Sequence, residues 1–116
     1  VADCAKNVAV IVGDTRSART LNPNDLPNLN VSISKNDKVI GTGFGHSGSY
    51  RSSPLESMAW IVNNLSSQGV ALREGDVVVT GACTLTKDIE YGATYTAEFQ
   101  GIGSVSCRLV RNNSKL

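Results

Sequence analysis

One short stretch of this chain carries a strong helix signal, and it restricts the fold more than any other feature. Ser53-Pro54-Leu55-Glu56 forms a capping box with proline at the first helical position, where its missing N–H is not needed. The apolar residues that follow recur at the spacing of one helical face: Leu55, Met58, Ala59, Val62 and Leu65. Gly69 is well placed to end the helix. The pattern predicts one main amphipathic helix over residues 54–67, with its apolar face packed against a sheet.

Two short apolar runs have the composition of buried strands. Residues 8–13 read VAVIVG and are closed by a Gly-Asp turn signal, and residues 77–80 read VVVT and end at Gly81. Runs of this length that are rich in β-branched residues favour a strand over a helix. A tight turn at residues 72–76 leads into the second run. We expect both runs to be buried strands.

Alternating segments predict the remaining strands. Residues 31–43 alternate apolar and polar side chains around the turn Lys35-Asn-Asp-Lys38, which predicts a hairpin with one buried face. Residues 94–100 and 104–110 alternate in the same way around Gly101-Ile-Gly103. Residues 15–30 carry two prolines and several Asn and Asp residues, which indicates a connecting loop.

These segments add up to one small domain. A chain of 116 residues with 41% hydrophobic content has room for one core. We expect a β-rich α+β domain over residues 1–116, a mixed β-roll or sandwich of about six strands around one helix, with residues 111–116 frayed.

Charge and cysteine content remove several classes of function. A net charge of +1 gives no electrostatic reason to expect nucleic acid or a membrane surface as a partner. No apolar run approaches the roughly 20 residues that cross a bilayer, so we expect a cytoplasmic protein. The cysteines Cys4, Cys83 and Cys107 fit neither a disulfide framework nor a zinc site, and we expect them to be reduced.

A set of widely spaced residues resembles a known family signature. In the stretch from residue 54 to 109, a proline-led helix with an Ala-Trp pair is followed by "G-x-x-L-x-x-G-D-x-V-x-x-G-A" and "G-x-G-x-V". The residues that fill these positions are Ala59, Trp60, Gly69, Leu72, Gly75, Asp76, Val78, Gly81, Ala82, Gly101, Gly103 and Val105. The pattern is similar to the carboxy-terminal part of the 2-keto-4-pentenoate hydratases and 4-oxalocrotonate decarboxylases, within the fumarylacetoacetate hydrolase superfamily.

The resemblance implies a metal-dependent lyase. Enzymes of this family hold Mg²⁺ or Mn²⁺ on carboxylates and use the ion to polarise a 2-oxo acid, so that water adds to a vinyl group or carbon dioxide leaves. The family's Glu-x-Glu ligand pair lies upstream of a "V-A-D" segment that Val1-Ala-Asp3 resembles, and this chain contains no Glu-x-Glu. We therefore expect the chain to lack the metal ligands and to be inactive alone.

The resemblance also nominates site residues. In the family the loop that matches Gly81, Ala82, Cys83 and Thr84 lines the substrate pocket, where backbone N–H groups approach the substrate carboxylate. Asp3 and Lys6 are weaker catalytic candidates, and Lys6 stands where the family has a polar residue.

Other residues have simpler structural explanations. His46 lies in the glycine-rich segment GTGFGHSGS, which suits a lid, but a single loop histidine without identified partners is usually a surface residue. Glu56 and Asp76 fit capping and turn roles, Trp60 fits packing better than stacking on a substrate, and Cys83 has no histidine near it in sequence to make it a nucleophile.

Three functions follow from these features. The first is a portion of a hydratase-like lyase acting on small unsaturated 2-oxo acids of the 2-hydroxypenta-2,4-dienoate type. The second is a 4-oxalocrotonate decarboxylase-like lyase, because Pro54-Leu-Glu-Ser57 is similar to that group's "P-A-E-S". The third is a non-catalytic binding or assembly module on the same scaffold. The expected partners are a small 2-oxo acid, if the site is completed, and either a second copy or a complementing amino-terminal segment.

Overall fold

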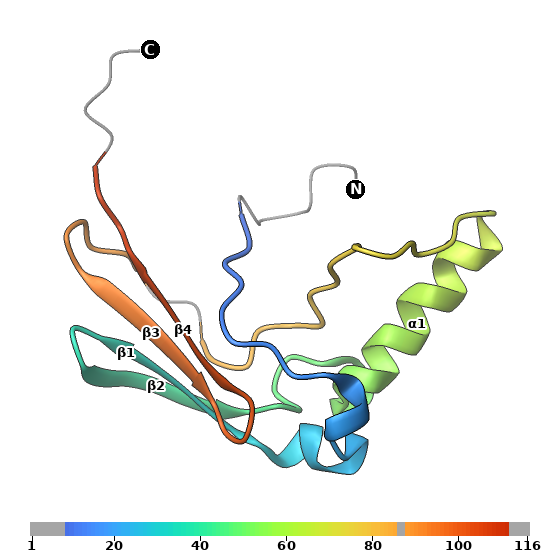
Figure 1. Cartoon of the computed structure of the whole chain (residues 1–116), viewed down its shortest axis with the longest axis horizontal. Helices are drawn as coiled ribbons and strands as arrows, with labels where there is room; N and C mark the ends of the chain where they lie inside the picture. Colours follow the sequence, from blue (N-terminus) through green and yellow to red (C-terminus); the bar gives the residue numbers. More distant parts are fainter. Residues whose placement is uncertain (1–8, 86–87, 112–116) are drawn as a thin grey trace.

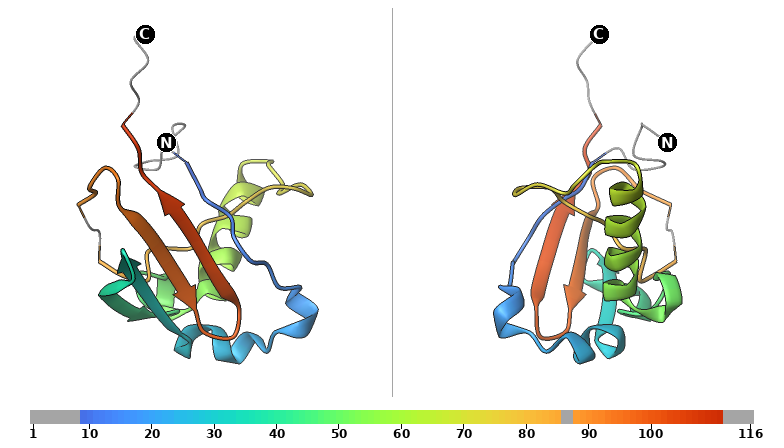
Figure 2. Two further views of the ribbon diagram at one scale, coloured as in Figure 1. Left: turned by 60° about the vertical axis from the view of Figure 1, so that its left-hand side comes forward. Right: turned by 90° about the vertical axis from the view of Figure 1, so that its right-hand side faces the viewer.

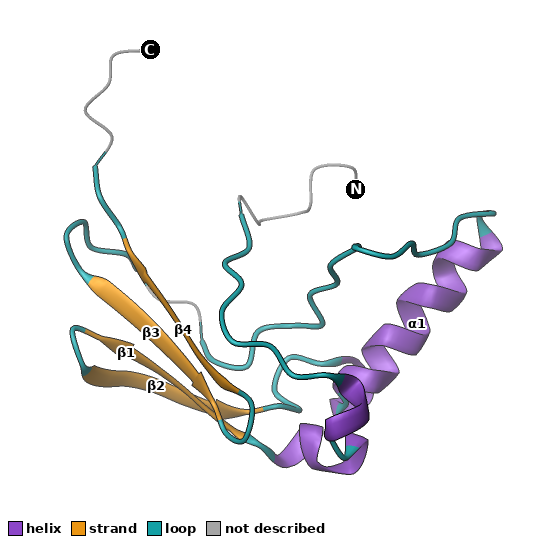
Figure 3. Ribbon diagram, in the orientation of Figure 1, coloured by secondary structure: helices purple, strands orange, loops and turns teal. Residues whose placement is uncertain are grey.

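The computed structural model describes residues 9–85 and 88–111 of the chain. Its regular elements are four strands, one α-helix and three short 3₁₀ helices (Figure 1). The strands β1 (Asn30–Lys35), β2 (Lys38–Phe44), β3 (Thr94–Phe99) and β4 (Gly103–Arg108) form one antiparallel sheet in the order β2-β1-β3-β4. The helix α1 (Pro54–Ser67) stands apart from this sheet in Figure 3. The architecture is α+β, as the sequence predicts.

The first hairpin, β1–β2, forms as predicted. Asn36 and Asp37 make the turn with φ values of 48° and 68°, the left-handed conformation that two-residue hairpin turns require and that Asn and Asp tolerate. The pairing shifts register between Ile33 and Ser34, which marks a bulge in the ladder. Val31, near the start of β1, is only 4% exposed, whereas the other residues of the two strands are half-buried or exposed, so the predicted buried face is formed at Val31 alone.

The second hairpin, β3–β4, is also confirmed, two residues shorter at its carboxyl end than predicted. Its register pairs Thr94 with Arg108 and Phe99 with Gly103. The Ile102 N–H donates to the Phe99 carbonyl oxygen at 3.0 Å and closes the turn. Since β3 also pairs with β1, the two hairpins join into one sheet.

Helix α1 has the predicted bounds and ends. The Ser53 hydroxyl oxygen accepts the Glu56 N–H at 3.4 Å, which is the expected cap. Gly69 takes a φ of 74°, and the Val70 N–H donates to the Leu65 carbonyl oxygen at 2.9 Å, which closes the last turn. The start and stop signals in the sequence therefore fixed both ends of the helix.

The expected six-stranded architecture was wrong, and so were two of its predicted strands. The described residues form four strands in one sheet, and no roll or sandwich of six. Residues 9–13 and 77–80 are extended, but neither segment pairs as a strand with any described residue. A strand exists only when a neighbouring strand takes up its backbone hydrogen bonds, and the sequence pattern alone cannot supply that neighbour.

The predicted burial of the helix face was also wrong. No residue of α1 is buried, and Leu55 and Val62 on its apolar face are exposed. Within the described residues the buried hydrophobic side chains are Val31, Ala93 and Tyr95. Val31 belongs to β1, Tyr95 to β3, and Ala93 directly precedes β3, so the buried residues lie in and beside the sheet and none belongs to the helix.

Short 3₁₀ helices occupy most of the predicted loop over residues 15–30. The helices η1 (Ala18–Thr20) and η2 (Pro23–Asn28) are capped by the side chains of Ser17 and Asn22. A third, η3 (Tyr50–Ser52), leads into α1. Figure 2 shows η1 and η2 at the end of the sheet where the β3–β4 turn lies.

Candidate functional site

The predicted substrate loop, residues 81–84, packs directly against the glycine-rich loop that follows β2. A Cβ atom at Gly43 would lie 1.7 Å from the Cys83 carbonyl oxygen, and one at Gly48 would lie 2.3 Å from the Ala82 carbonyl oxygen. A Cβ atom at Gly81 would likewise lie 2.3 Å from the Gly48 carbonyl oxygen. Three glycines therefore allow two backbones to meet where any side chain would separate them.

Hydrogen bonds hold the glycine-rich loop in shape. The Ser47 hydroxyl oxygen accepts the Phe44 N–H at 3.1 Å, and the Ser49 hydroxyl donates to the Gly45 carbonyl oxygen at 3.3 Å. The His46 N–H donates to the Pro27 carbonyl oxygen at 2.8 Å, which ties the loop to η2. The hydrogen bonds therefore hold the loop in place against residues 81–83, and the bond from His46 attaches it to η2.

Residues 81–84, the predicted substrate loop, carry unengaged backbone N–H groups in the part of the chain that the structure describes. Among the described residues, no atom accepts a hydrogen bond from the N–H groups of residues 81–84. Ala82 is exposed, and Gly81, Cys83 and Thr84 are half-buried. Free N–H groups on a small-residue loop are suitable donors for a carboxylate, which is the role that the family resemblance implies for this loop.

His46 lies on the loop that touches the predicted substrate loop, which the sequence did not foresee. Its ring stacks on Phe44 with centroids 5.3 Å apart and an interplanar angle of 11°. The imidazole is half-buried, and its backbone N–H is engaged with η2. The structure therefore places His46 in a hydrogen-bonded loop that touches the predicted substrate loop.

Cys83 has the electrostatics of a structural thiol. Burial raises the pKa of the Cys83 thiol, because desolvation disfavours the thiolate. A protonated thiol is a weak nucleophile at neutral pH. This agrees with the low weight that the sequence gave to Cys83 as a nucleophile.

The remaining nominated residues fall into two groups. Asp3 and Lys6, the catalytic candidates, lie outside the described residues. Asp76 accepts the Arg73 N–H at 2.8 Å through its carboxylate and closes the predicted turn. Trp60 is exposed on α1, and its ring lies 6.3 Å from that of Tyr50 at an angle of 50°. Its expected packing against a core is therefore limited to a neighbour on η3.

The described residues do not fit the divalent ion of the family. Nowhere in residues 9–85 and 88–111 do three His, Cys, Asp or Glu side chains gather closely enough to hold a metal ion. We therefore assign no metal ligand and derive no step through a metal. Within the same residues, no helix is long and apolar enough to cross a membrane.

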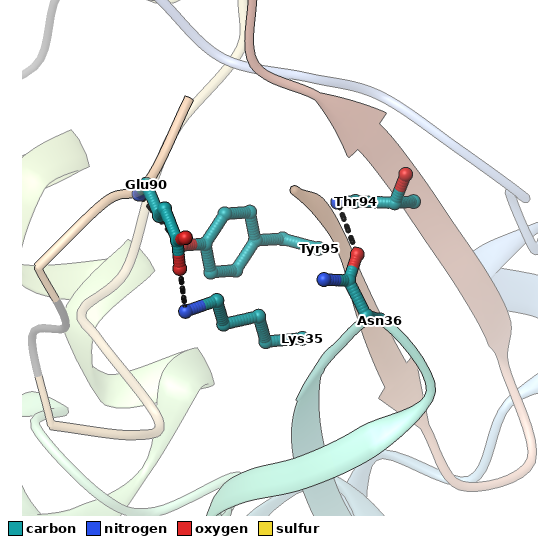
Figure 4. A network of polar contacts seen from close by, with 5 residues as sticks. All are labelled: Lys35, Asn36, Glu90, Thr94 and Tyr95. Atoms are coloured by element: carbon teal, nitrogen blue, oxygen red, sulfur yellow. Dashed lines mark hydrogen bonds and ion pairs between the residues drawn. The ribbon is translucent and has the colours of Figure 1, made fainter. Parts of the chain in front are cut away.

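A polar cluster that the sequence did not reveal joins the first hairpin to the segment before β3 (Figure 4). Lys35 Nζ donates to Glu90 Oε2, and the Glu90 N–H donates to Tyr95 Oη at 2.9 Å. The Thr94 N–H donates to Asn36 Oδ1 at 3.0 Å. Lys35 and Glu90 are 55 positions apart in the sequence, and Asn36 and Thr94 are 58 positions apart. Contacts at such separations leave no local signal in a single sequence.

A second unforeseen contact fixes the segment before η1 against the β3–β4 turn. The Ser104 N–H donates to Asp14 Oδ2 at 3.0 Å, and the Asp14 N–H donates to the Ser104 carbonyl oxygen at 3.3 Å. A Cβ atom at Gly103 would lie 2.5 Å from the Asp14 Cβ. The second glycine of the "G-x-G-x-V" motif is therefore explained by the close approach of Asp14.

An open groove of about 860 Å³ lies next to this contact, and its lining includes Gly43, which touches the predicted substrate loop through Cys83. Asp14 and Arg16 line one side of it, and residues of β1, β2 and the β3–β4 turn line the other. Arg16 is already engaged there, because its Nε donates to the Ile102 carbonyl oxygen at 3.3 Å. None of residues 81–84 lines the groove, so this groove and the motif-derived site do not coincide.

Comparison with known proteins shows which enzymes this chain is similar to. The chain is 34% identical over 110 residues to a 4-oxalocrotonate decarboxylase of Pseudomonas putida, a match that covers 95% of this chain and 40% of the relative. It is 30% identical over 105 residues to a 2-keto-4-pentenoate hydratase of Paraburkholderia phymatum, which covers 90% of this chain and 38% of the relative. No family model matches the chain.

A solved structure agrees with these sequence matches. The 4-oxalocrotonate decarboxylase from Pseudomonas putida G7, complexed with calcium and acetate, superposes on this chain with a TM-score of 0.72 and 31% identity. The chain is homologous to the hydratase and decarboxylase group. The superposition covers 84% of this chain and 36% of the decarboxylase, so the chain spans well under half the length of the relatives that it matches.

The resemblance stated from the sequence is thereby confirmed at the level of this group. A second structure of the Pseudomonas putida G7 decarboxylase, complexed with magnesium and adipate, superposes with a TM-score of 0.69 at 30% identity. Divalent cations and carboxylates therefore occur together in structures of this relative. The partial coverage is consistent with a portion of a hydratase or decarboxylase.

Proposed function

We propose that this chain is a portion of a hydratase-like lyase that acts on small unsaturated 2-oxo acids of the 2-hydroxypenta-2,4-dienoate type. The observation that carries the proposal is the match of 90–95% of the chain to both hydratases and decarboxylases. Within the proposal, Mg²⁺ or Mn²⁺ supplies the electrophilic centre, and its ligands come from outside the described residues. The superfamily assignment and the cytoplasmic location expected from the sequence belong to the same proposal.

The loop over residues 81–84 would contribute the carboxylate-binding wall. Its free N–H groups point to an anionic group as the natural ligand, and its small side chains leave room for that group to approach. The glycine contacts with residues 43 and 48 would hold the donors in fixed positions. The role of this chain would thus be to bind and orient the 2-oxo acid.

A decarboxylase-like lyase is the second candidate. Both solved structures and the sequence match at 34% identity are 4-oxalocrotonate decarboxylases. The two reactions share the 2-oxo acid and differ in the bond that changes, since a hydratase adds water and a decarboxylase releases carbon dioxide. A non-catalytic binding or assembly module is the third candidate, and it is consistent with the described residues, which contain no cluster able to hold a metal ion.

One set of assays separates the three candidates. The natural gene product, with its length set by intact mass, is titrated with Mg²⁺ and Mn²⁺ by calorimetry and assayed on two substrates. Loss of 2-hydroxypenta-2,4-dienoate without release of carbon dioxide supports the hydratase. Release of carbon dioxide from 4-oxalocrotonate supports the decarboxylase. The absence of both metal binding and turnover would overturn both lyase proposals in favour of the module.

A matched pair of variants tests the predicted substrate loop. Ala82→Phe fills the exposed small-residue position on the loop, and Ala71→Phe makes the same change at an exposed position in the segment after α1. We expect Ala82→Phe to raise the KM for the 2-oxo acid and Ala71→Phe to leave it unchanged. Equal KM values for the two variants would remove residues 81–84 from the site.

A further inference from the structure

The two faces of the sheet differ in chemistry. The strand register places the buried Val31 and Tyr95 on one face, together with Phe99. The opposite face, called the polar face below, carries hydroxyl, amide and charged side chains, among them Asn30, Ser32, Thr96, Glu98, Ser104 and Ser106. Antiparallel sheets commonly bury their apolar face and leave such a polar face in water. We therefore expect the polar face to be open to solvent in the natural gene product as well.

The groove of about 860 Å³ opens on this polar face. In the row of paired residues that crosses the sheet there, the opposite face is closed at three positions. Val31 is buried, and a Cβ atom at Gly43 would lie 1.7 Å from the Cys83 carbonyl oxygen. At Gly103, a Cβ atom would lie 2.5 Å from the Asp14 Cβ. The strand side chains that remain to line the groove are those of the polar face: Asn30, Ser32, Thr42, Phe44, Glu98 and Ser104.

The groove runs across the sheet from one edge strand to the other. Phe44 belongs to β2 and Ser104 to β4, which are the outer strands of the sheet. Three strand spacings separate these strands, about 14 Å in all. The volume lies within the roughly 300–1,000 Å³ that is typical of small-molecule pockets. A ligand that fills the groove is therefore elongated, and it is longer than the small 2-oxo acids proposed above.

Two amide side chains in the groove are fixed by each other. Gln100 Oε1 accepts the Asn30 N–H at 3.0 Å and Asn30 Nδ2 at 3.1 Å. Among the described residues, nothing bonds to Gln100 Nε2 or to Asn30 Oδ1, so the pair presents one donor and one acceptor to a ligand. The hydroxyls of Ser32 and Thr42 make no hydrogen bond with a described residue, and each can donate and accept.

The β4 end of the groove carries both signs of charge. Arg16 Nε donates to the Ile102 carbonyl oxygen, and the terminal nitrogens of Arg16 have no partner among the described residues. Glu98 is exposed, pairs with Ser104 in the register and forms no ion pair with a described residue. Asp14 also lines this end, so the groove holds one cationic and two anionic side chains. This balance disfavours phosphate and other strong anions, whereas a neutral ligand with many hydroxyls finds both donors and acceptors.

An aromatic ring closes the β2 end of the groove. Phe44 is 46% exposed, and the His46 ring stacks on one side of it with centroids 5.3 Å apart. The other side of the Phe44 ring is left for a ligand. A sugar ring has an apolar C–H face and a rim of hydroxyls, so it can pack on an aromatic ring while its hydroxyls bond to polar side chains.

We propose that this groove binds a neutral oligosaccharide of two or three sugar rings. One ring packs on Phe44, the amides of Asn30 and Gln100 bind the hydroxyls in the middle, and Glu98 and Arg16 bind those at the β4 end. The site lies on the face of the sheet opposite the substrate loop, so it is independent of the proposed lyase reaction.

The test uses the natural gene product and four neutral probes. These are trisaccharides of glucose, galactose, mannose and N-acetylglucosamine, titrated by calorimetry and by saturation-transfer NMR. We expect at least one of them to bind saturably, with a Kd of about 1 mM or tighter. The absence of binding by all four would overturn the proposal. Tighter binding of glutamate or inorganic phosphate than of every trisaccharide would overturn it too, because the groove would then select charge.

Variants locate the binding site in the groove. Phe44→Ala removes the aromatic ring and Glu98→Ala removes an exposed carboxylate, and we expect each to weaken binding by about tenfold. The matched controls are Val39→Ala, an exposed position of the same strand β2, and Glu74→Ala, an exposed glutamate outside the groove. Melting curves establish that each variant is folded. Equal weakening by the variants and their controls would overturn the assignment to this groove.

A substitution in the substrate loop separates this site from the lyase site. Ala82→Phe should leave trisaccharide binding unchanged, because residue 82 does not line the groove. Loss of trisaccharide binding in Ala82→Phe would overturn the groove as the binding site. A protein that binds a trisaccharide but turns over neither 2-oxo acid would keep this site and overturn the lyase proposal, so the two failures are distinguishable.

Discussion

Gly43 and Cys83 touch through their backbones, because a Cβ atom at residue 43 would lie 1.7 Å from the Cys83 carbonyl oxygen. Gly43→Ala should therefore force the glycine-rich loop away from the substrate loop and destabilise the fold by about 3 kcal/mol, near the upper end for overpacking changes. Urea denaturation followed by circular dichroism measures this loss. Gly75→Ala is the comparison, since Gly75 has a positive φ of 91° and nothing within 4 Å of its Cβ position.

That comparison separates a steric clash from backbone strain. Gly75→Ala carries only the penalty of a left-handed conformation, about 1–2 kcal/mol. If Gly43→Ala cost no more than Gly75→Ala, the two loops would not be in close contact.

Asp14 holds the segment before η1 by accepting the Ser104 N–H at 3.0 Å. Asp14→Ala removes this acceptor and should destabilise the fold by about 1 kcal/mol. Asp14→Asn keeps an oxygen at the same position and should recover most of the loss. The stability of both variants in urea, with amide exchange at Ser104, checks the assignment, and equal losses for Ala and Asn would contradict it.

The ion pair of Lys35 and Glu90 predicts a pH dependence with a defined sign. The hydrogen bond from Lys35 lowers the pKa of the Glu90 carboxyl in the folded state. The pair therefore stabilises the fold above the ordinary glutamate pKa, and this contribution is lost as the pH falls through the lowered value. The same bond raises the pKa of Lys35, so the contribution is also lost as the pH rises through that value.

Glu90→Gln should accordingly lower the melting temperature slightly at neutral pH and make no difference in strong acid. The effect is small because both side chains face solvent. Melting curves over a pH series, with Glu74→Gln as an exposed glutamate that makes no ion pair with the described residues, provide the check. A difference that persisted undiminished in strong acid would rule out the ion pair as its cause.

Burial of Cys83 predicts that its thiol is alkylated slowly. Because burial raises the pKa of its thiol, iodoacetamide should label Cys83 more slowly in the folded chain than in urea at the same pH. Peptide mass spectrometry of time-quenched samples gives both rates. Equal rates in the two states would mean that the fold does not shield the Cys83 sulfur.

Local signals in the sequence predicted the local structure well. The cap at Ser53 and the stop at Gly69 gave both ends of α1, and the Asn36-Asp37 turn gave the first hairpin. Each depends on residues within a few positions of one another, and the hydrogen bonds that define it are made there.

Features that depend on distant residues were missed or misjudged. The runs at residues 9–13 and 77–80 have strand composition, but pairing needs a neighbour that composition does not name. The contact between Gly43 and Cys83 leaves no signal beyond the glycines at residues 41–48 and at Gly81. The contact between Lys35 and Glu90 leaves no local signal in the sequence. The family resemblance pointed to residues 81–84 but not to the loop that supports them.

The contact between Asp14 and Ser104 also limits the order in which this chain can assemble. These residues are 90 positions apart, whereas the two hairpins close over short spans of sequence. Short loops close first, because closure entropy rises with loop length. Residues 9–16 therefore reach their place only after the second hairpin has formed, because Ser104 belongs to its strand β4.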